Sequence, residues 1–430
     1  MNVYLLNYFP KLDRNGVDTY VSELGDYLEQ IDSISMHYVW IDCNQESVEI
    51  KTTLTAVHIY LPKFNPLISK EIRNPDEYLA SYIVEDAQNK ENIIIHINWM
   101  NHCGVSRYLK AKVDCRIILT NHCLPWKDLI FSNYNQFFQL LQYSSKDKKL
   151  DYIPKILEKD KYFYDNVDKI ITVTKSAETI LQNIYQICNT KLKTIYNGTS
   201  ISRFKVSTEM STSLRLKYGF NPTDVLLLYA GRITKLKGII DFIKVFEEFI
   251  AETGITNIKL LIAGNGQYDK VLEEINTLHG NIVLLGGLNK TKLYEFYRFV
   301  NIGLIPSYTE QCSFTALEML HCSLPILASD VDGLTELITH QKGLRFNVVF
   351  NEKEATFDNN DIKFKLRTLI DNLCYADRGY HCRTNDGSEY TSSFMATKTI
   401  ELYKDVSVQL PSCNLDQCGY QSDKIFTIII

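Results

Sequence analysis

Two basic side chains follow a predicted buried strand in the second half of the 430-residue chain. Residues 225–230 are apolar, Gly231 ends the run, and Arg232 and Lys237 come just before a segment with helical spacing. Backbone N–H groups at a helix start and the planar guanidinium of an arginine both suit a diphosphate. Phosphate binding and simple solvent exposure therefore both remain open for these cations.

Two carboxylates, Glu310 and Glu318, stand eight positions apart after the fourth predicted strand of that half. If the whole segment were helical, eight residues would extend roughly 12 Å and leave both side chains on one broad face. Carboxylates accept hydrogen bonds from vicinal hydroxyl groups. The spacing therefore suits a ligand with hydroxyls at both ends, such as a nucleotide sugar, although two solvated surface carboxylates would show the same pattern.

Glycines end two further predicted strands. Gly264 and Gly266 follow one, and Gly286 and Gly287 precede Leu288 after the next. A glycine at a strand end permits positive φ or leaves room for a ligand beside the backbone. A tight turn alone would also account for each of these glycines.

The elements that must carry these residues alternate between apolar runs and amphipathic segments. The apolar runs are residues 3–6, 34–41, 56–61, 93–97, 116–120, 169–173 and 192–196, then 225–230, 258–263, 282–285, 302–305, 326–328 and 344–348. Helical spacing is clear in residues 17–29, 176–187, 239–250 and 315–322. This alternation predicts two α/β domains with doubly wound parallel sheets, which meet within the Ser/Thr-rich residues 197–223.

Composition excludes several classes of protein. Hydrophobic residues make up 45% and charged residues 23%, as in folded domains. A formal charge of −5 gives the whole chain no electrostatic attraction for nucleic acid. No run approaches the roughly 18 apolar residues of a membrane-spanning helix, and Asn7 and Pro10 interrupt the apolar N-terminus. Eleven irregularly spaced cysteines without a secretion signal predict reduced thiols and a cytoplasmic protein.

Two other features have simple interpretations. The cysteines and histidines that could be pictured as metal ligands are Cys413, Cys418, His381, Cys382, His96, His102, Cys103, His122 and Cys123. They lack the paired spacing of zinc sites, which favours incidental thiols and core or cleft histidines. The lysine-rich residues 146–161 predict a solvated helical face, with weak peripheral contact to an anionic membrane as the alternative.

Taken in order, the motifs resemble those of the retaining glycosyltransferases of family 4. The likeness rests on Gly231-Arg232, Lys237-Gly238, Gly264-Asn265-Gly266, Glu310-x7-Glu318 and residues 324–329 and 333–337, and in the first half on Gly16-Val17 and residues 94–96, 119–122, 167–173 and 195–198. It extends to about residue 404. The resemblance implies the GT-B fold, in which the parallel sheets of two Rossmann-like domains face a central cleft.

The resemblance also implies how the chain is divided. Residues 1–198 would form an acceptor-side domain, and residues 199–388 a nucleotide-sugar-binding domain. Residues 389–405 would form a helix that crosses back to the first domain. Residues 406–430 would remain as a tail, which could be an edge strand, a docked end or a disordered segment.

Each site residue receives a role from the resemblance. Arg232 and Lys237 would bind the diphosphate and stabilise the charge of the leaving group. Glu310 would hold the donor sugar, Glu318 the ribose, and His122 would polarise or hydrogen-bond the sugar. The other donor-binding positions would be Gly16, Gly231, Gly264, Leu288 beside the base, and the backbone of Cys312, Ser313 and Phe314. Alanine at Arg232 or Glu318 is expected to abolish transfer without changing thermal stability.

Three departures from the family pattern bear on these roles. Ser313 stands where glycine is usual, and Asn15 precedes Gly16 where a second glycine is frequent. Asp330-Val331-Asp332 has the D-x-D pattern of metal-binding transferases, but it falls in a loop that ordinarily binds no metal in this family. We therefore expect a metal-independent enzyme.

The predicted activity is retaining transfer of a sugar from a nucleoside-diphosphate sugar, with uridine favoured over guanosine on family frequency. The acceptor is unidentified and is expected to be a glycan, a glycolipid or another polysaccharide precursor. No protein nucleophile and no cofactor besides the donor are expected. The alternatives are a sugar-nucleotide epimerase or phosphorolytic enzyme on the same fold, or a non-catalytic sugar-nucleotide-binding protein. The location would be the cytoplasm or the inner face of the membrane.

Overall fold

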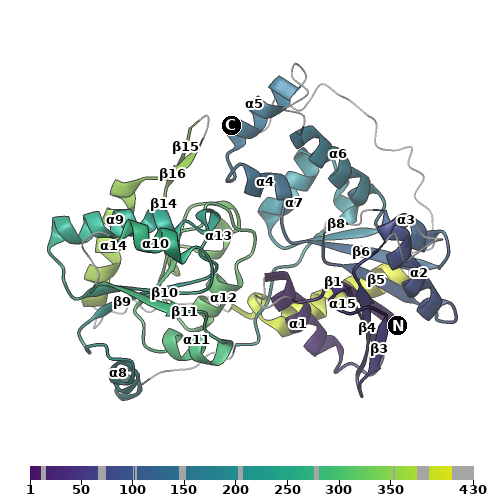
Figure 1. Cartoon of the computed structure of the whole chain (residues 1–430), viewed down its shortest axis with the longest axis horizontal. Coiled ribbons are helices and arrows are strands. Elements are labelled where there is room, and N and C mark those ends of the chain that lie inside the picture. The colour runs from purple at the N-terminus through teal and green to yellow at the C-terminus, as the bar shows by residue number, and fades with distance from the viewer. Residues whose placement is uncertain are drawn as a thin grey trace. The chain divides into compact units, whose positions relative to one another are not determined.

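The computed structural model describes residues 1–10, 16–65, 74–99, 101, 104–144, 152–201, 207–275, 280–351, 354–374 and 387–408 (Figure 1). Contacts divide the chain into two units. Unit 1 contains Met1–Leu124, Tyr143–Ser200 and Glu389–Ile430, and unit 2 contains Pro125–Gln142 and Ile201–Ser388. Pro125–Gln142 therefore packs with the second unit although it lies in the first half of the sequence.

Unit 1 is built on an eight-stranded sheet in the order β3-β4-β2-β1-β5-β6-β7-β8. The strands are β1 (Asn2–Tyr8), β2 (Ser35–Cys43), β3 (Glu49–Thr52), β4 (Ala56–Pro62), β5 (Ile93–Ile97), β6 (Cys115–Asn121), β7 (Lys169–Thr172) and β8 (Leu192–Thr194). Neighbouring strands are parallel except β3, which pairs antiparallel with β4 at the edge. The strand order reverses between β1 and β5, and open α/β sheets bind ligands at such switch points.

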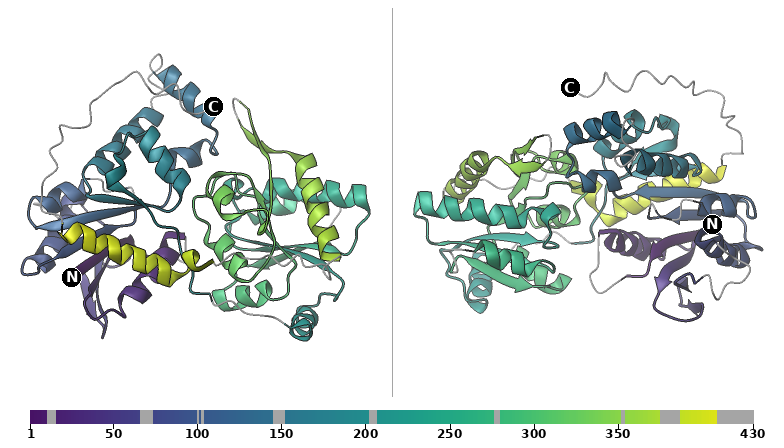
Figure 2. Two further views of the ribbon diagram at one scale, coloured as in Figure 1. Left: turned by 180° about the vertical axis from the view of Figure 1, so that it is seen from behind. Right: turned by 45° about the horizontal axis from the view of Figure 1, so that its top comes forward.

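Helices cover both faces of the sheet in unit 1. They are α1 (Gly16–Leu28), α2 (Pro75–Ala87), α3 (Val105–Lys110), α6 (Tyr152–Asp165), α7 (Lys175–Asn183) and α15 (Ser392–Val408), with a 3-10 turn, η2 (Asn189–Lys191). The long helix α15 packs against α1 and is drawn in yellow in Figure 2. Buried side chains of α15 such as Met395, Leu402 and Tyr403 attach the end of the described chain to unit 1.

His96 of β5 is fully buried between the sheet and α15. Its two ring nitrogens form hydrogen bonds with the hydroxyls of Tyr403 and Thr120, each at 2.6 Å. Burial, with a smaller contribution from His122, lowers the pKa of His96 to about 3. The folded protein therefore keeps this imidazole neutral, whereas the unfolded chain takes up a proton near pH 6.5.

This difference predicts a loss of stability in mild acid. Between pH 6.5 and about 3 the unfolded state binds the proton and the folded state does not, so stability falls as the pH is lowered. The loss from His96 amounts to about 2 kcal/mol at pH 5. His96→Gln should flatten the dependence of the melting temperature on pH between 7 and 5, and substitution of the exposed His340 by Gln should not. Equal slopes in wild type and His96→Gln would contradict this assignment.

Unit 2 is built on a six-stranded parallel sheet in the order β11-β10-β9-β12-β13-β14. Its strands are β9 (Val225–Ala230), β10 (Ile258–Ala263), β11 (Ile282–Gly286), β12 (Ile302–Ile305), β13 (Ile326–Ser329) and β14 (Gly343–Phe346), and a separate antiparallel hairpin is formed by β15 (Val348–Phe350) and β16 (Ala355–Phe357). The order reverses between β9 and β12. This is the strand order of dinucleotide-binding folds, with the switch point at the ends of those two strands.

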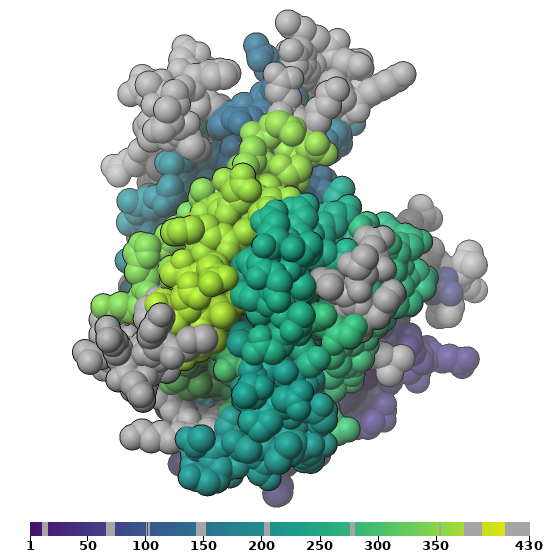
Figure 3. Space-filling model, turned by 90° about the vertical axis from the view of Figure 1, so that its left-hand side faces the viewer, coloured from purple at the N-terminus to yellow at the C-terminus, as the bar shows by residue number. Residues whose placement is uncertain are grey.

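Helices connect the strands of the unit 2 sheet, and α4 and α5 come from the earlier segment that clusters with this unit. They are α4 (Pro125–Leu129), α5 (Tyr134–Ser144), α8 (Thr208–Lys217), α9 (Ile239–Thr253), α10 (Tyr268–Glu274), α11 (Lys290–Tyr297), α12 (Phe314–His321), α13 (Asp332–Leu337) and α14 (Asn359–Cys374), with 3-10 turns η3 (Lys235–Lys237) and, at the chain's return to unit 1, η5 (Gly387–Tyr390). The helices α9 and α14 lie side by side on the outer face (Figure 3), where Lys363 Nζ is 2.6 Å from Glu252 Oε1.

The helix α8 forms within the Ser/Thr-rich stretch that was expected to be a connection between domains. Ser207 caps its first turn by accepting a hydrogen bond from the N–H of Met210. Arg215, 7% exposed, donates to the carbonyl oxygens of Asp224 and Phe299, each at 2.7 Å. These bonds attach α8 to the base of the unit 2 sheet.

Some expectations concern residues outside the described part of the chain. They are His102, Cys103, Asn15, His381, Cys382, Cys413, Cys418, residues 145–151 and the tail from residue 409. Among the helices that the structure describes, none is long and apolar enough to span a bilayer.

Candidate functional site

The candidate residues of unit 2 follow strands that end at the same edge of one parallel sheet. Arg232 and Lys237 follow β9, Gly264 follows β10, Leu288 follows β11, and Glu310 follows β12. Because all these strands run in the same direction, their carboxyl ends and the loops after them lie together. The structure therefore places on one edge the motifs that were separate in the sequence.

A cation and a carboxylate meet across the switch point between β9 and β12. Lys237 Nζ forms an ion pair with Glu310 Oε1, and the side chains are 24% and 13% exposed. Ser307 Oγ donates to the same carboxylate oxygen at 3.1 Å. The partly buried pair thus offers both a positive group and hydroxyl-accepting oxygens to a ligand at this edge.

Gly238 brings these two loops into contact. It has φ +65°, and a Cβ atom there would collide with the carbonyl oxygen of Pro306 at the end of β12. The N–H of Tyr308 also donates to the carbonyl of Leu236 at 2.9 Å. A residue other than glycine at position 238 would push the loop of Lys237 away from that of Glu310.

Gly264 likewise allows the backbone after β10 to lie close to the backbone after β9. Its φ of +147° disfavours other residues, and a Cβ atom would collide with the carbonyl oxygen of Gly231. The N–H of Gly231 also donates a hydrogen bond to the carbonyl oxygen of Ala263 at 2.9 Å. These contacts fix the backbone from which Arg232 projects, and Arg232 itself is exposed.

Glu318 lies on α12, but Glu310 precedes that helix, which begins at Phe314. The two carboxylates are therefore not on one continuous helix. Glu318 is 6% exposed, and its carboxylate accepts hydrogen bonds from Tyr297 at 3.1 Å and Tyr294 at 3.4 Å. The hydroxyl of Thr315, in the first turn of α12, donates to the carbonyl of Ala230 at 3.2 Å, which holds this turn against the end of β9.

Three further candidates surround the start of α12. Ser313 is its N-cap and accepts a hydrogen bond from Ala316 N with φ −68°, so this position does not need glycine. Cys312 is buried and Phe314 is partly exposed beside it. Leu288, partly exposed, lies between β11 and α11.

Asp128 of α4 is a candidate that sequence reasoning missed. Burial raises the pKa of its carboxyl group, and the charge of Glu310 acts in the same direction, whereas Lys237, Lys127 and Arg232 oppose the rise. The aspartate therefore lies within electrostatic range of both cations and of Glu310. Burial raises the pKa of Tyr229, Glu310 adds to this rise and Arg232 opposes it, and the Tyr229 hydroxyl donates to the carbonyl of Arg232 at 2.5 Å.

In unit 1, His122 lies just beyond β6. Its Nε2 is 3.1 Å from Asn98 Oδ1, and its ring packs edge-on against Tyr20 at 4.6 Å between centroids. Burial lowers the pKa of His122 to about 3, which keeps the ring neutral. Asn98 was also missed, although it directly follows the buried strand β5. It is 1% exposed and donates to the carbonyl of Leu6.

Gly16 is the first residue of α1 and is exposed. Asp18 follows in the first turn, is 8% exposed, and accepts a hydrogen bond from Asn7 Nδ2 at 3.0 Å. A carboxylate at this end of the helix already interacts with the positive end of the helix dipole, and it disfavours a second anion there.

The two carboxylates of the D-x-D pattern point to different partners. Asp330 forms an ion pair with Arg345 at 2.7 Å and accepts a hydrogen bond from Thr335. Asp332 forms an ion pair with Lys127. Each carboxylate is therefore already neutralised by a cation of unit 2.

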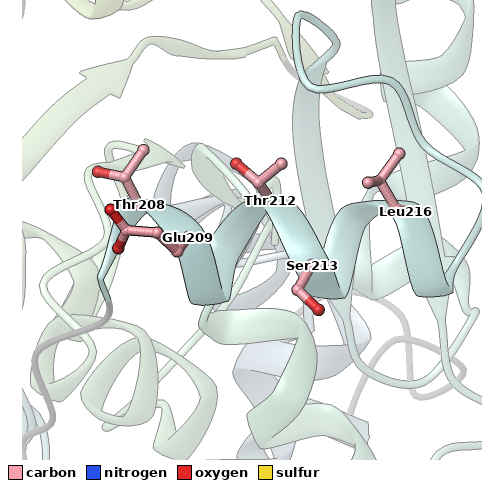
Figure 4. Close-up of a pocket in the computed structure, with 5 residues that line it drawn as sticks. All are labelled: Thr208, Glu209, Thr212, Ser213 and Leu216. Carbon is pink, nitrogen blue, oxygen red and sulfur yellow. The ribbon is translucent and has the colours of Figure 1, made fainter.

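A hollow on the surface of unit 2 lies along α8 and contains none of the candidate residues (Figure 4). It is lined by Thr208, Glu209, Thr212, Ser213 and Leu216. The side chains shown in the close-up all come from this one helix. The hollow is open to solvent, whereas ligand pockets enclose most of the ligand's surface.

Two protein-family models match the chain. The model described as Glycosyltransferase Family 4 matches residues 14–203, and the model described as Glycosyl transferases group 1 matches residues 211–358. Between them they include the candidate residues of both units.

Curated relatives match part of the chain. An uncharacterized glycosyltransferase of Methanocaldococcus jannaschii is 32% identical over 178 residues, which are 40% of this chain and 45% of that protein. A D-inositol 3-phosphate glycosyltransferase of Catenulispora acidiphila is 27% identical over 40% of this chain and 43% of its own length. The matched region thus spans less than half of each relative.

Solved structures match nearly the whole chain. Sucrose-phosphate synthase from Thermosynechococcus elongatus has a TM-score of 0.69 and 19% identity, covering 94% of this chain and 98% of its own. HepE of Anabaena, in a complex with UDP, has a TM-score of 0.68 and 13% identity, covering 94% and 100%. This similarity confirms the predicted fold class, GT-B with two parallel-sheet Rossmann-like domains.

Proposed function

Because the chain belongs to glycosyltransferase family 4, we propose that it transfers a sugar from a nucleoside-diphosphate sugar to an acceptor hydroxyl with retention of anomeric configuration. The observation that supports this most is the Lys237–Glu310 pair at the switch point of unit 2. A donor of this type carries a diphosphate beside a polyhydroxylated ring. The pair offers a cation for the diphosphate and, next to it, a carboxylate for the sugar hydroxyls.

For unit 2, the proposal gives each charged residue one part of the donor. Arg232 and Lys237 would bind the diphosphate, and Glu310 would accept hydrogen bonds from the sugar. Glu318, already oriented by Tyr297, would hold the ribose hydroxyls. Gly231, Gly264, Leu288 beside the base, and the backbone of Cys312, Ser313 and Phe314 would complete the donor site.

For unit 1, we propose that the neutral imidazole of His122 hydrogen-bonds the donor sugar, with Asn98 fixing the ring's orientation. Gly16 would let the backbone at the start of α1 approach the uncharged sugar of the donor, since Asp18 disfavours an anion at this helix end. These assignments rest on the family's pattern and on the local geometry within unit 1.

The chemistry needs no protein nucleophile. The bond between the anomeric carbon and the diphosphate oxygen breaks as the acceptor oxygen bonds to the same face of that carbon. The departing phosphate oxygen takes the acceptor's proton, and Arg232 and Lys237 stabilise the charge that develops on the diphosphate. Both carboxylates would bind hydroxyls, unlike the acid and base pair of a glycosidase.

The donor is proposed to be a uridine diphosphate sugar. Structures of HepE with UDP and with UDP-glucose support this choice by analogy of fold. The acceptor would be a glycan, a glycolipid or a polysaccharide precursor, and the enzyme would act in the cytoplasm or at the inner face of a membrane, with weak peripheral contact.

A thermal-shift panel tests the proposal. Saturating UDP should raise the melting temperature by several degrees, because a ligand at 100 times its Kd adds about 2.7 kcal/mol of stability. UMP, which lacks the second phosphate, should raise it less, and GDP and ADP compare the bases. A melting temperature that no nucleoside diphosphate changes would contradict the proposal.

Transfer should not depend on a divalent metal. The diphosphate charge is balanced by Arg232 and Lys237, and both aspartates of the D-x-D pattern are already paired with cations. Donor turnover in EDTA should therefore equal turnover in buffer alone. A loss in EDTA that Mn²⁺ or Mg²⁺ restores would overturn metal independence.

A further inference from the structure

A buried ion pair joins α4 to the start of α13. Lys127, 1% exposed, contacts Oδ1 of Asp332, whose side chain is 6% exposed. Oδ2 of the same carboxylate accepts hydrogen bonds from Ser132 Oγ at 2.8 Å and Thr309 Oγ1 at 3.2 Å. A buried pair repays its loss of hydration only when its remaining hydrogen-bonding positions are satisfied. Here the α4–α5 turn and the loop after β12 supply those hydrogen bonds to the carboxylate of Asp332.

The backbone on both sides of the pair is strained. Asp332 has φ +42°, and Phe131 and Ser132 have φ +53° and +57°. Residues other than glycine adopt this left-handed region at a cost, and they remain there only when surrounding contacts hold them. Glycine would relieve the strain at position 332, but it would lose the carboxylate that Lys127, Ser132 and Thr309 share.

The pair is connected directly to the loop that carries Glu310. Thr309, which donates to Asp332, is the residue before Glu310, and the N–H of Gly333 donates to the carbonyl of Glu310 at 3.0 Å. The start of α13 therefore holds the loop at two points, the side chain of Thr309 and the carbonyl of Glu310. A further hydrogen bond to this loop, from the N–H of Tyr308 to the carbonyl of Leu236, comes from η3.

We propose that Lys127 and Asp332 are positioning residues that hold residues 307–313 in the geometry Glu310 needs to bind the donor sugar. This inference rests on the proposed function. Misplacing a group that orients a substrate by about 1 Å can cost a hundredfold in rate. The nucleotide would depend on Arg232 and Lys237 after β9 and on Glu318 of α12, none of which lies in residues 307–313. Loss of the pair should therefore affect the sugar more than the nucleotide.

The main test is the double variant Lys127→Met with Asp332→Gly in the full chain. It removes both charges together, so neither is left buried without its partner, and glycine accepts the positive φ. Backbone amides in residues 305–313 should exchange with deuterium about tenfold faster than in wild type. At saturating donor, kcat should fall about tenfold or more, and the Kd for UDP should stay within about twofold.

Thr309→Val is a second variant that introduces no buried charge. It removes only the hydroxyl between Asp332 and the loop, and should change exchange and kcat in the same direction by a smaller factor. Asp330→Asn is the matched control, because it alters a carboxylate two residues away whose partners are Arg345 and Thr335. It should leave both readouts unchanged.

Three results would overturn the inference. The first is deuterium exchange in residues 305–313 that stays at the wild-type rate in both the double variant and Thr309→Val. The second is faster exchange in the double variant with kcat unchanged. The third is a fall in kcat in Asp330→Asn as large as that in the double variant. If wild type neither binds UDP nor turns over a donor, the proposed function fails instead. The exchange measurement then still decides whether the pair holds the loop.

Discussion

Arg232→Ala should lower kcat/KM for donor turnover by about 10²–10³-fold without changing the melting temperature. Arg232 is exposed at the end of β9, where its side chain can leave without creating a cavity. Its contribution would be largest in the transition state, when negative charge accumulates on the departing diphosphate. Kinetics with a labelled donor, together with a melting curve of the same preparation, measures both effects.

Lys235→Ala is the matched control for Arg232→Ala. Lys235 is an exposed cation three residues away, and its amine lies over the ring of Phe131 at 5.8 Å from the centroid. Its loss should change turnover by less than about threefold. If turnover falls equally in both variants, Arg232 contributes only general electrostatic attraction for the donor. Full turnover in Arg232→Ala would contradict its assignment to the diphosphate.

Glu318→Ala should abolish nucleotide binding and also destabilise unit 2. The carboxylate is 6% exposed, and Tyr297, which donates to it, is itself fully buried. Removing the acceptor leaves that hydroxyl without this partner, at a cost of about 1–3 kcal/mol. The sequence-based expectation of unchanged stability therefore does not fit the burial that the structure shows for this residue.

Glu318→Gln separates binding from stability. The amide oxygen can still accept from Tyr297, so the melting temperature should stay closer to wild type, but a neutral amide binds ribose hydroxyls more weakly than a carboxylate does. The Kd for UDP should rise about tenfold. Glu273→Ala, at an exposed position on α10, is the control and should change neither property. UDP binding at wild-type strength in Glu318→Gln would contradict the ribose assignment.

The strands and the order of the motifs could be predicted from the sequence because they depend on local patterns. Successive apolar residues identify buried parallel strands such as β9, and glycines mark their ends. The edge strand β3 had no such signal, because all four of its residues are exposed. The burial of Glu318 had a signal in the sequence. Its neighbours Leu317 and Met319 are both apolar but lie on different sides of α12, as in a helix that is buried all round.

The contacts that shape the site could not be predicted, because they join distant parts of the chain. Lys237 and Glu310 are 73 residues apart, and Lys127 and Asp332 are 205 apart. Nothing in the local pattern of residues 125–142 indicates that they pack with unit 2. For the same reason the electrostatic role of Asp128 and the buried partner of Asp332 appear only once the fold is known.

Calorimetric titration of UDP into the wild-type chain and into variants at Arg232, Lys237, Glu310 and Glu318 tests most directly whether these four side chains bind one donor. We predict a complex of one UDP per chain that is weakened strongly by alanine at Arg232, Lys237 or Glu318. Glu310→Ala should spare UDP but remove the added affinity of the matching UDP-sugar. A chain that binds no nucleoside diphosphate, or binds UDP equally well in all four variants, would contradict the account.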